Sequence, residues 1–96
     1  MKERRILKIN ELLKRTLSEI IEKEIGRESG TLLTLTRAEV SDDLKTARVW
    51  LSIFPPSKAV EVLGKIEKTK NTIEKSLNQK ISLRFFLKLK FFIDKF

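Results

Sequence analysis

The chain of 96 residues is long enough for one hydrophobic core, and we expect residues 1–96 to form a single domain. It contains no cysteine and no histidine, which excludes disulfides, thiolate nucleophiles, imidazole bases and the common zinc sites, so we expect neither a metal nor a cofactor. The net charge of +8 arises mainly from residues 1–15, which carry +4, and residues 65–96, which carry +6. Such clustering indicates a polyanionic partner, with nucleic acid the leading class.

No part of the sequence indicates a membrane span or a secretory leader. No run of about 18 apolar residues occurs, and the N-terminus leads directly into a charged amphipathic pattern. A basic helix that lies on an anionic membrane usually carries Trp or Phe on its apolar face. The first apolar stripe of this chain is aliphatic, so we expect a cytoplasmic protein.

A long amphipathic helix is predicted for the N-terminal quarter of the chain. Its apolar residues recur at spacings of three and four, with charged residues on the opposite side. Gly26 is a natural left-handed cap for the end of this helix, and residues 26–30 are expected to form a loop. The predicted core-facing residues are Ile6, Ile9, Leu13, Leu17, Ile20 and Ile21.

Two strands are predicted next, over residues 32–40 and 47–54. The second strand alternates apolar positions with Arg48 and Ser52 on the other face. Ser41 to Asp43 can accept hydrogen bonds from nearby backbone amides, which favours a tight turn and an antiparallel hairpin. Trp50 and Phe54 share the second face of their strand, which indicates partial cover on both sides, and we interpret Trp50 as a packing residue.

A helical segment with an interrupted apolar stripe is predicted for residues 58–79. Pro55 and Pro56 end the preceding strand, and Ser57 is expected to cap a helix that begins at Lys58. The stripe then stops where Lys70 occupies a core-facing position, which predicts two short helices or one kinked helix. Its expected members are Val60, Leu63 and Ile66 before the interruption and Ile73 and Leu77 after it.

A last strand is predicted from Leu83 to Asp94, because apolar residues occupy alternate positions throughout. Phe85 and Phe91 fall on its apolar face and are expected in the core. Phe86 and Phe92 interrupt its polar face, where either a helix edge covers them or they are exposed for a partner. The order helix, strand, strand, helix, helix, strand predicts an α+β fold with a three-stranded sheet covered by helices on one face. This is the order of a type II KH domain, which clamps single-stranded nucleic acid between its helices.

The predicted hairpin also carries the most specific motif of the chain. Residues 33–49 read LTLTRAEVSDDLKTARV, which resembles the signature hairpin of bacterial ribosome-binding factor A, and the first helix and the last strand resemble that family as well. The resemblance implies a non-enzymatic, monomeric, cytoplasmic KH-like factor. It implies binding to the small (30S) ribosomal subunit and its 16S rRNA during late maturation and rRNA processing.

In the family that this chain resembles, a helix, kink, helix element replaces the usual Gly-x-x-Gly loop of KH domains. The kink carries Ala-x-Gly, and it aligns here with Thr69, Lys70 and Asn71. The chain therefore departs from the family at both defining positions, although Asn tolerates left-handed backbone angles better than other non-Gly residues. It also has Leu87 where a Pro is usual.

Two groups of basic residues are candidate RNA contacts. Four lysines flank the predicted junction between helices, where the N-terminal amides of a second helix would also face a phosphate. The other group lies on the first helix, where a solvated charged face is an equally good explanation. The first group is Lys65, Lys68, Lys70 and Lys75, and the second is Arg4, Arg5, Lys8, Lys14 and Arg15.

Two other function classes are weighed against RNA binding. The best carboxylate pair for catalysis is Asp42 and Asp43, but adjacent turn aspartates usually cap backbone amides, so we expect no enzyme. The alternative function is a protein–protein interaction module that uses the C-terminal Phe-rich strand. RNA binding would weaken steeply as salt rises, which distinguishes the two.

Overall fold

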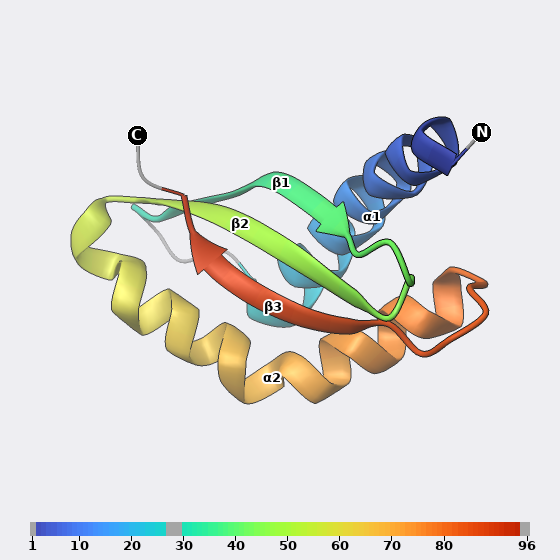
Figure 1. Cartoon of the computed structure of the whole chain (residues 1–96). Coiled ribbons are helices and arrows are strands. Elements are labelled where there is room, and N and C mark those ends of the chain that lie inside the picture. The colour runs from blue at the N-terminus through green and yellow to red at the C-terminus, as the bar shows by residue number, and fades with distance from the viewer. Residues whose placement is uncertain (1, 27–29, 95–96) are drawn as a thin grey trace.

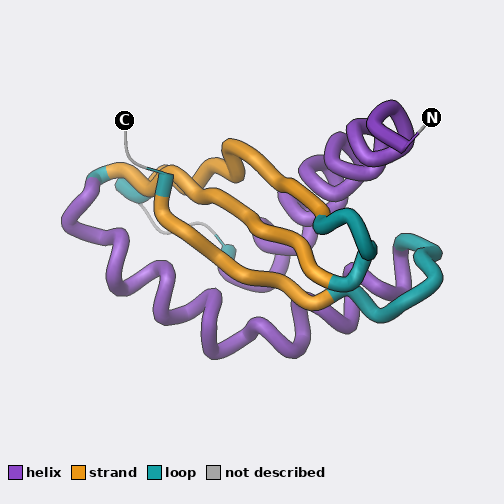
Figure 2. The backbone as a smooth tube through the Cα atoms, viewed as in Figure 1, coloured by secondary structure: helices purple, strands orange, loops and turns teal. Residues whose placement is uncertain are grey.

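Two helices pack against one face of a three-stranded sheet (Figure 1) in the computed structural model, which describes residues 2–26 and 30–94. The strands are ordered β1-β2-β3; β1 and β2 are antiparallel, and β2 and β3 are parallel. Figure 2 shows the strands side by side, with the N-terminal part of the first helix extending beyond the sheet. The elements are α1 (Lys2–Ile25), β1 (Leu32–Val40), β2 (Thr46–Phe54), a 3-10 turn η1 (Pro56–Lys58), α2 (Ala59–Lys80) and β3 (Lys88–Ile93).

The first helix is confirmed, together with its buried face and its end. Leu13 and Leu17 are completely buried, and Ile6 and Ile9 pack partly against the same core. Gly26 has a φ of 74°, and its N–H donates to the carbonyl of Glu22 at 3.0 Å, as expected for a left-handed cap. Residues 27–29 of the predicted loop lie outside the described residues.

The turn of the β1–β2 hairpin is held by side chains, as predicted. The Ser41 hydroxyl donates to Asp43 Oδ1 at 2.6 Å, and the same carboxylate oxygen accepts from the Lys45 N–H at 3.1 Å. These contacts support Leu44, a non-glycine residue whose φ of 61° is in the left-handed region. Because both hydrogen bonds favour the ionised carboxylate, with that from Ser41 the larger cause, the pKa of Asp43 lies below its ordinary value.

We expect the pKa of the Asp43 carboxyl to lie below its ordinary value and to rise when Ser41 is replaced by alanine. A lowered folded-state pKa means that the contact stabilises the fold above the unfolded-state pKa. That contribution is lost as the pH falls through the folded-state value. An NMR titration of the Asp43 carboxyl carbon in the wild type and in Ser41→Ala measures both midpoints. Identical midpoints would contradict the assigned cause.

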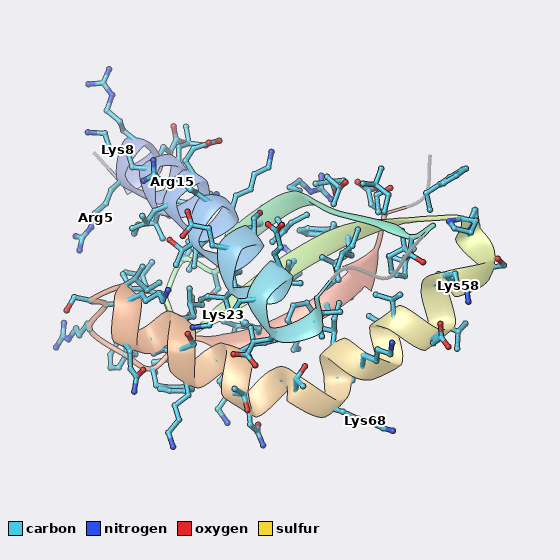
Figure 3. The ribbon with its side chains drawn as sticks, turned by 180° about the vertical axis from the view of Figure 1, so that it is seen from behind. Arg5, Lys8, Arg15, Lys23, Lys58 and Lys68 are labelled. Atoms are coloured by element: carbon cyan, nitrogen blue, oxygen red, sulfur yellow. The ribbon has the colours of Figure 1, made fainter. Side chains whose placement is uncertain are left out.

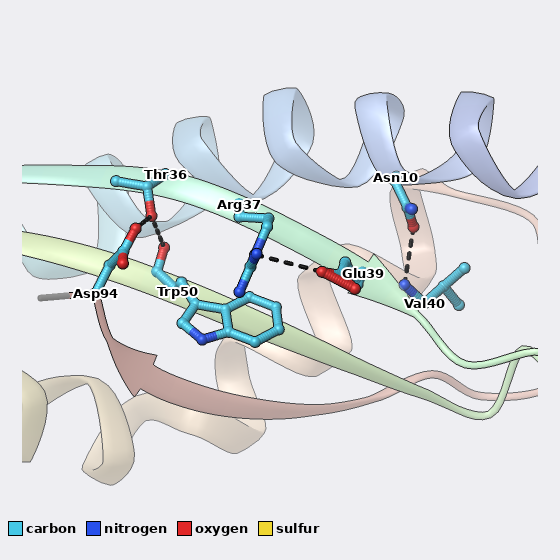
Figure 4. Close-up of polar contacts among 7 residues, drawn as sticks. All are labelled: Asn10, Thr36, Arg37, Glu39, Val40, Trp50 and Asp94. Atoms are coloured by element: carbon cyan, nitrogen blue, oxygen red, sulfur yellow. Dashed lines mark hydrogen bonds and ion pairs between the residues drawn. The ribbon is translucent and has the colours of Figure 1, made fainter. Parts of the chain in front are cut away.

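Side-chain amides and a carboxylate attach the helices to the sheet. From α1, Asn10 Oδ1 accepts the Val40 N–H at 2.8 Å (Figure 4). From α2, Asn78 Oδ1 accepts the Leu87 N–H at 2.8 Å, and its Nδ2 donates to the Leu87 carbonyl at 3.0 Å. Buried Glu74 accepts the Leu89 N–H at 2.6 Å through Oε2. These polar contacts determine where β3 begins along β2, because Leu87 and Leu89 are tied to α2.

Of the two alternatives predicted for residues 58–79, two short helices is wrong and one bent helix is confirmed, since α2 is a single helix that bends near its middle (Figure 1). Ile66 and Ile73 are seven residues apart, which is two helical turns, so the buried stripe keeps its phase across the polar turn. Ser57 does not cap α2 either, because it lies in η1. The N-cap residue of α2 is Lys58, which makes no side-chain capping hydrogen bond, and the helix begins at Ala59. Val60, which was predicted to face the core, is 86% exposed, and Val62 is buried in its place.

The last strand is shorter than predicted and begins at Lys88. Residues 82–87 instead lead from α2 into β3, because the backbone of Leu87 bonds to Asn78 and not to a neighbouring strand. Phe91 is buried as predicted, but Phe85 is 41% exposed, so its placement in the core was wrong. Phe86 and Phe92 are both exposed, so a helix edge does not cover them, and a partner for them stays a prediction.

Candidate nucleic-acid interface

The four lysines predicted on α2 occupy three sides of the helix. Lys68 and Lys75 are seven residues apart, both exposed on the side opposite the core, and Figure 3 shows Lys68 pointing away from the molecule. Lys65 and Lys70 are half-buried and lie on opposite flanks of the buried stripe. Only Lys68 and Lys75 therefore form a continuous exposed row.

The predicted kink does not expose backbone amides. The Thr69 hydroxyl donates to the Lys65 carbonyl at 2.8 Å and lies 3.3 Å from that of Ile66, a contact typical of slightly bent helices. Leu44 is the one non-glycine residue with a positive φ within residues 2–26 and 30–94, so Asn71 is not left-handed. The N-terminal amides of a second helix are thus absent at this point, and side-chain charge remains as the means of binding phosphate.

The basic residues predicted on α1 form a separate group. Arg4, Lys8 and Arg15 lie on the side of α1 opposite Leu13, whereas Arg5 and Lys14 flank that row, and all five cations are exposed. In Figure 3 the labelled members of this group lie between the N-terminal end and the middle of α1, well away from Lys68. The structure therefore does not combine the two predicted basic groups into one site.

A cavity of about 370 Å³ lies between α1, β1 and α2. Its walls are mainly aliphatic and include Ile21, Leu33 and Val62. Of the lysines predicted as RNA contacts on α2, Lys65 lines this cavity. Phosphate binding requires charged or amide donors, so this cavity is not the centre of an RNA site.

The open face of the sheet carries functional candidates that the sequence interpretation missed. Trp50 of β2 stacks on Phe92 of β3, with ring centroids 5.5 Å apart and an angle of 27° between the planes. The register pairs these two residues directly, and it places Arg37 of β1 on the other side of Trp50. The cations that share this face are Arg37, Arg48, Lys88 and Lys90.

A bulge in β1 organises this face. The register shifts between Leu35 and Arg37, and the Thr36 hydroxyl turns across the sheet to donate to Asp94 Oδ2 at 2.7 Å. Its oxygen is also 3.2 Å from the Trp50 carbonyl oxygen. Figure 4 shows the Arg37 guanidinium above the Trp50 indole, with Arg37 Nε 3.3 Å from Glu39 Oε1. The centroid of the Trp50 ring lies 3.9 Å from the guanidinium carbon.

The alternation of β2 was the available signal for this surface. Arg48 and Trp50 lie two residues apart on the polar face of the strand, as the pattern predicts. Trp50 was expected to be partly covered, and it is half-buried. What covers it is Arg37 and Phe92, and neither contact follows from the local pattern.

Comparison with known proteins agrees with this fold. The sequence profile of the family "Ribosome-binding factor A" matches residues 5–96. This chain belongs to the ribosome-binding factor A family. The family member of Protochlamydia amoebophila is 34% identical over 89 residues, which are 91% of this chain and 68% of that protein.

Solved structures of family members confirm the predicted α+β, KH-like architecture. The Thermotoga maritima protein, a putative ribosome binding factor A solved by NMR, superposes with a TM-score of 0.80 at 20% identity and covers 95% of this chain and 88% of its own. A homology model of Thermus thermophilus ribosome binding factor A, fitted into a cryo-EM map of a 30S complex, gives a TM-score of 0.66 at 21% identity, over 85% of this chain and 87% of that one. Within the described part of this chain, neither helix is long and apolar enough to cross a membrane.

Proposed function

We propose that this protein is a non-enzymatic assembly factor that binds the small (30S) ribosomal subunit through its 16S rRNA during late maturation and rRNA processing. The observation that carries the proposal is the match of the family profile over residues 5–96. The cytoplasm is the expected location, and a single KH-like domain acting as a monomer is the expected form. The fitting of the Thermus thermophilus family member into a cryo-EM map of its 30S complex supports the same partner.

Side-chain charge is the proposed means of attachment. Lys68 and Lys75 form an exposed row on α2, and the cations of α1 provide a second positive surface. Flexible ammonium groups bind phosphates as point charges without reading bases, so they position the protein on a folded RNA surface. Binding would release condensed counterions, which makes the affinity fall steeply with salt.

We expect Lys68→Glu combined with Lys75→Glu to weaken binding to immature small subunits about ten-fold at moderate salt and to reduce its dependence on salt. These two lysines are better targets than half-buried Lys70, because they are exposed and their replacement leaves the core intact. Co-sedimentation with purified immature subunits at several salt concentrations measures the effect.

The matched control is Lys23→Glu combined with Lys58→Glu, which changes the net charge equally at exposed positions outside the predicted set (Figure 3). The control should bind within about two-fold of the wild type. Equal weakening by both pairs would show that net charge alone acts, and undiminished binding by the α2 pair would remove these lysines from the interface.

The second candidate function is a protein-docking module, which the exposure of Phe86 and Phe92 favours. Phe86 is 53% and Phe92 40% exposed, and β3 is an edge strand of the sheet. A flat response of subunit binding to salt would favour this function over RNA binding.

A further inference from the structure

We infer that the open face of the sheet is a stacking platform for the bases of single-stranded RNA, centred on Trp50 and Phe92. This inference rests on the proposed function and adds a second contact surface to it. The lysines of α2 and the platform lie in different layers of the molecule, since both helices pack on the opposite face of the sheet (Figures 1 and 3). One protein could therefore hold a folded RNA surface by one layer and an unpaired strand by the other.

The aromatic pair has the geometry of an extended stack. Trp50 and Phe92 are neighbours across β2 and β3, with ring centroids 5.5 Å apart, and Phe92 is 40% exposed. Neither ring belongs to the hydrophobic core, which lies on the other face of the strands. Unpaired bases stack on exposed aromatic rings whatever their sequence.

The Arg37 guanidinium lies over the Trp50 ring and continues the stack onto β1. The Arg37 guanidinium carbon lies 3.9 Å from the Trp50 ring centroid, and Arg48 approaches the same ring at 5.7 Å. The ion pair with Glu39 orients the Arg37 side chain, which is 57% exposed. Arg37, Trp50 and Phe92 thus form a row of stacked groups across three strands. Guanidinium planes stack on nucleic-acid bases as aromatic rings do, so bases would stack on the exposed Arg37 and Phe92, next to Trp50.

The charges of this face suit a phosphate backbone. Its two carboxylates are already engaged, since Glu39 pairs with Arg37 and Asp94 accepts the Thr36 hydroxyl. Three further cations stand exposed around the aromatic pair: Arg48, Lys88 and Lys90. Lysine is depleted in the core of protein–protein interfaces, whereas basic residues interleaved with aromatic ones are typical of surfaces that bind single strands. The face therefore fits RNA better than a protein partner.

The test uses the fluorescence of Trp50 to report RNA binding, because Trp50 is the only tryptophan of the chain. We expect an unstructured ten-nucleotide RNA of mixed sequence to quench its fluorescence, whereas polyphosphate of the same charge and a duplex RNA do so much less. Phe92→Ala should weaken binding of the labelled RNA about ten-fold and Arg48→Gln about three-fold. Fluorescence anisotropy of the labelled RNA measures these affinities.

Two controls match these substitutions elsewhere on the surface. Val60→Ala removes an apolar side chain that is 86% exposed on α2, and Lys23→Gln removes one exposed charge from α1. Both should keep the wild-type affinity for the RNA within about two-fold. Circular dichroism melts of all four variants verify folding, and Arg48→Gln alters an exposed side chain, so it remains informative if Phe92→Ala unfolds.

Several results would overturn the inference while leaving the proposed function intact. RNA that binds without changing Trp50 emission, or equal quenching by polyphosphate, would mean that no base stacks on this face. Weaker binding of Phe92→Ala to whole small subunits, with no quenching by RNA, would make the face a protein-docking surface. The proposed function fails separately, if the wild type does not bind immature subunits at all.

Discussion

We expect Ile66→Ala to lower the free energy of unfolding by about 2–5 kcal/mol, whereas Val60→Ala should change it by less than about 0.5 kcal/mol. Ile66 has no solvent-exposed surface and lies in the centre of α2, where the helix packs on the sheet. Its truncation removes apolar contacts and leaves a cavity that the surrounding side chains fill only in part. Val60 is 86% exposed, so its truncation removes few apolar contacts and little stability.

Urea denaturation followed by far-UV circular dichroism measures both free energies. The pair is informative because both residues belong to the apolar stripe predicted from the sequence, and only the structure separates them. Similar losses for the two variants would mean that Val60 packs against the core, and α2 would then have to be rotated about its axis.

Replacing Asn78 by alanine is expected to cost about 1–5 kcal/mol of stability and to loosen β3 selectively. The side chain accepts the Leu87 N–H at 2.8 Å and donates to the Leu87 carbonyl at 3.0 Å. Its loss leaves two backbone groups without their partner in a partly buried place, and each such group costs about 1–3 kcal/mol. The better helix propensity of alanine offsets about 0.7 kcal/mol of the cost.

Asn71→Ala is the matched control, since it makes the same chemical change at an exposed position of the same helix. It should leave stability unchanged or raise it slightly, through helix propensity alone. Hydrogen exchange then locates the effect, with faster exchange at Lys90 and Phe92, whose N–H groups face β2, in Asn78→Ala than in the control. Uniformly faster exchange in both variants would show that Asn78 has no special role in placing β3.

The elements that the sequence predicted well are those whose signals are local. The apolar stripe of α1 has six members between Ile6 and Ile21. Gly26 ends the helix because glycine readily adopts left-handed backbone angles. The hairpin turn depends on Ser41 and Asp43, which bond to backbone and side-chain groups within five residues. Neither element needs a distant partner to define its bounds.

The errors lie where distant contacts decide. Val60 and Val62 both fit a helical stripe, and only the packing of α2 on the sheet selects Val62. Phe85 continues the alternation of the last strand, but the bonds of Asn78 to Leu87 delay β3 until Lys88. Lys70 suggested a break in the helix, although the phase of Ile66 and Ile73 is unchanged across it.

The sequence by itself determined the fold class, the family and the basic character of this protein, because periodicity, turn residues and a hairpin motif are written in consecutive positions. Only the tertiary structure decided that α2 is continuous and that the predicted basic groups of α1 and α2 stay apart. It alone also placed Phe92 against Trp50 and Arg37 over the indole. The physical reason is that these contacts join strands distant in sequence, whose register depends on the bulge at Thr36 and on the attachment of β3 to α2.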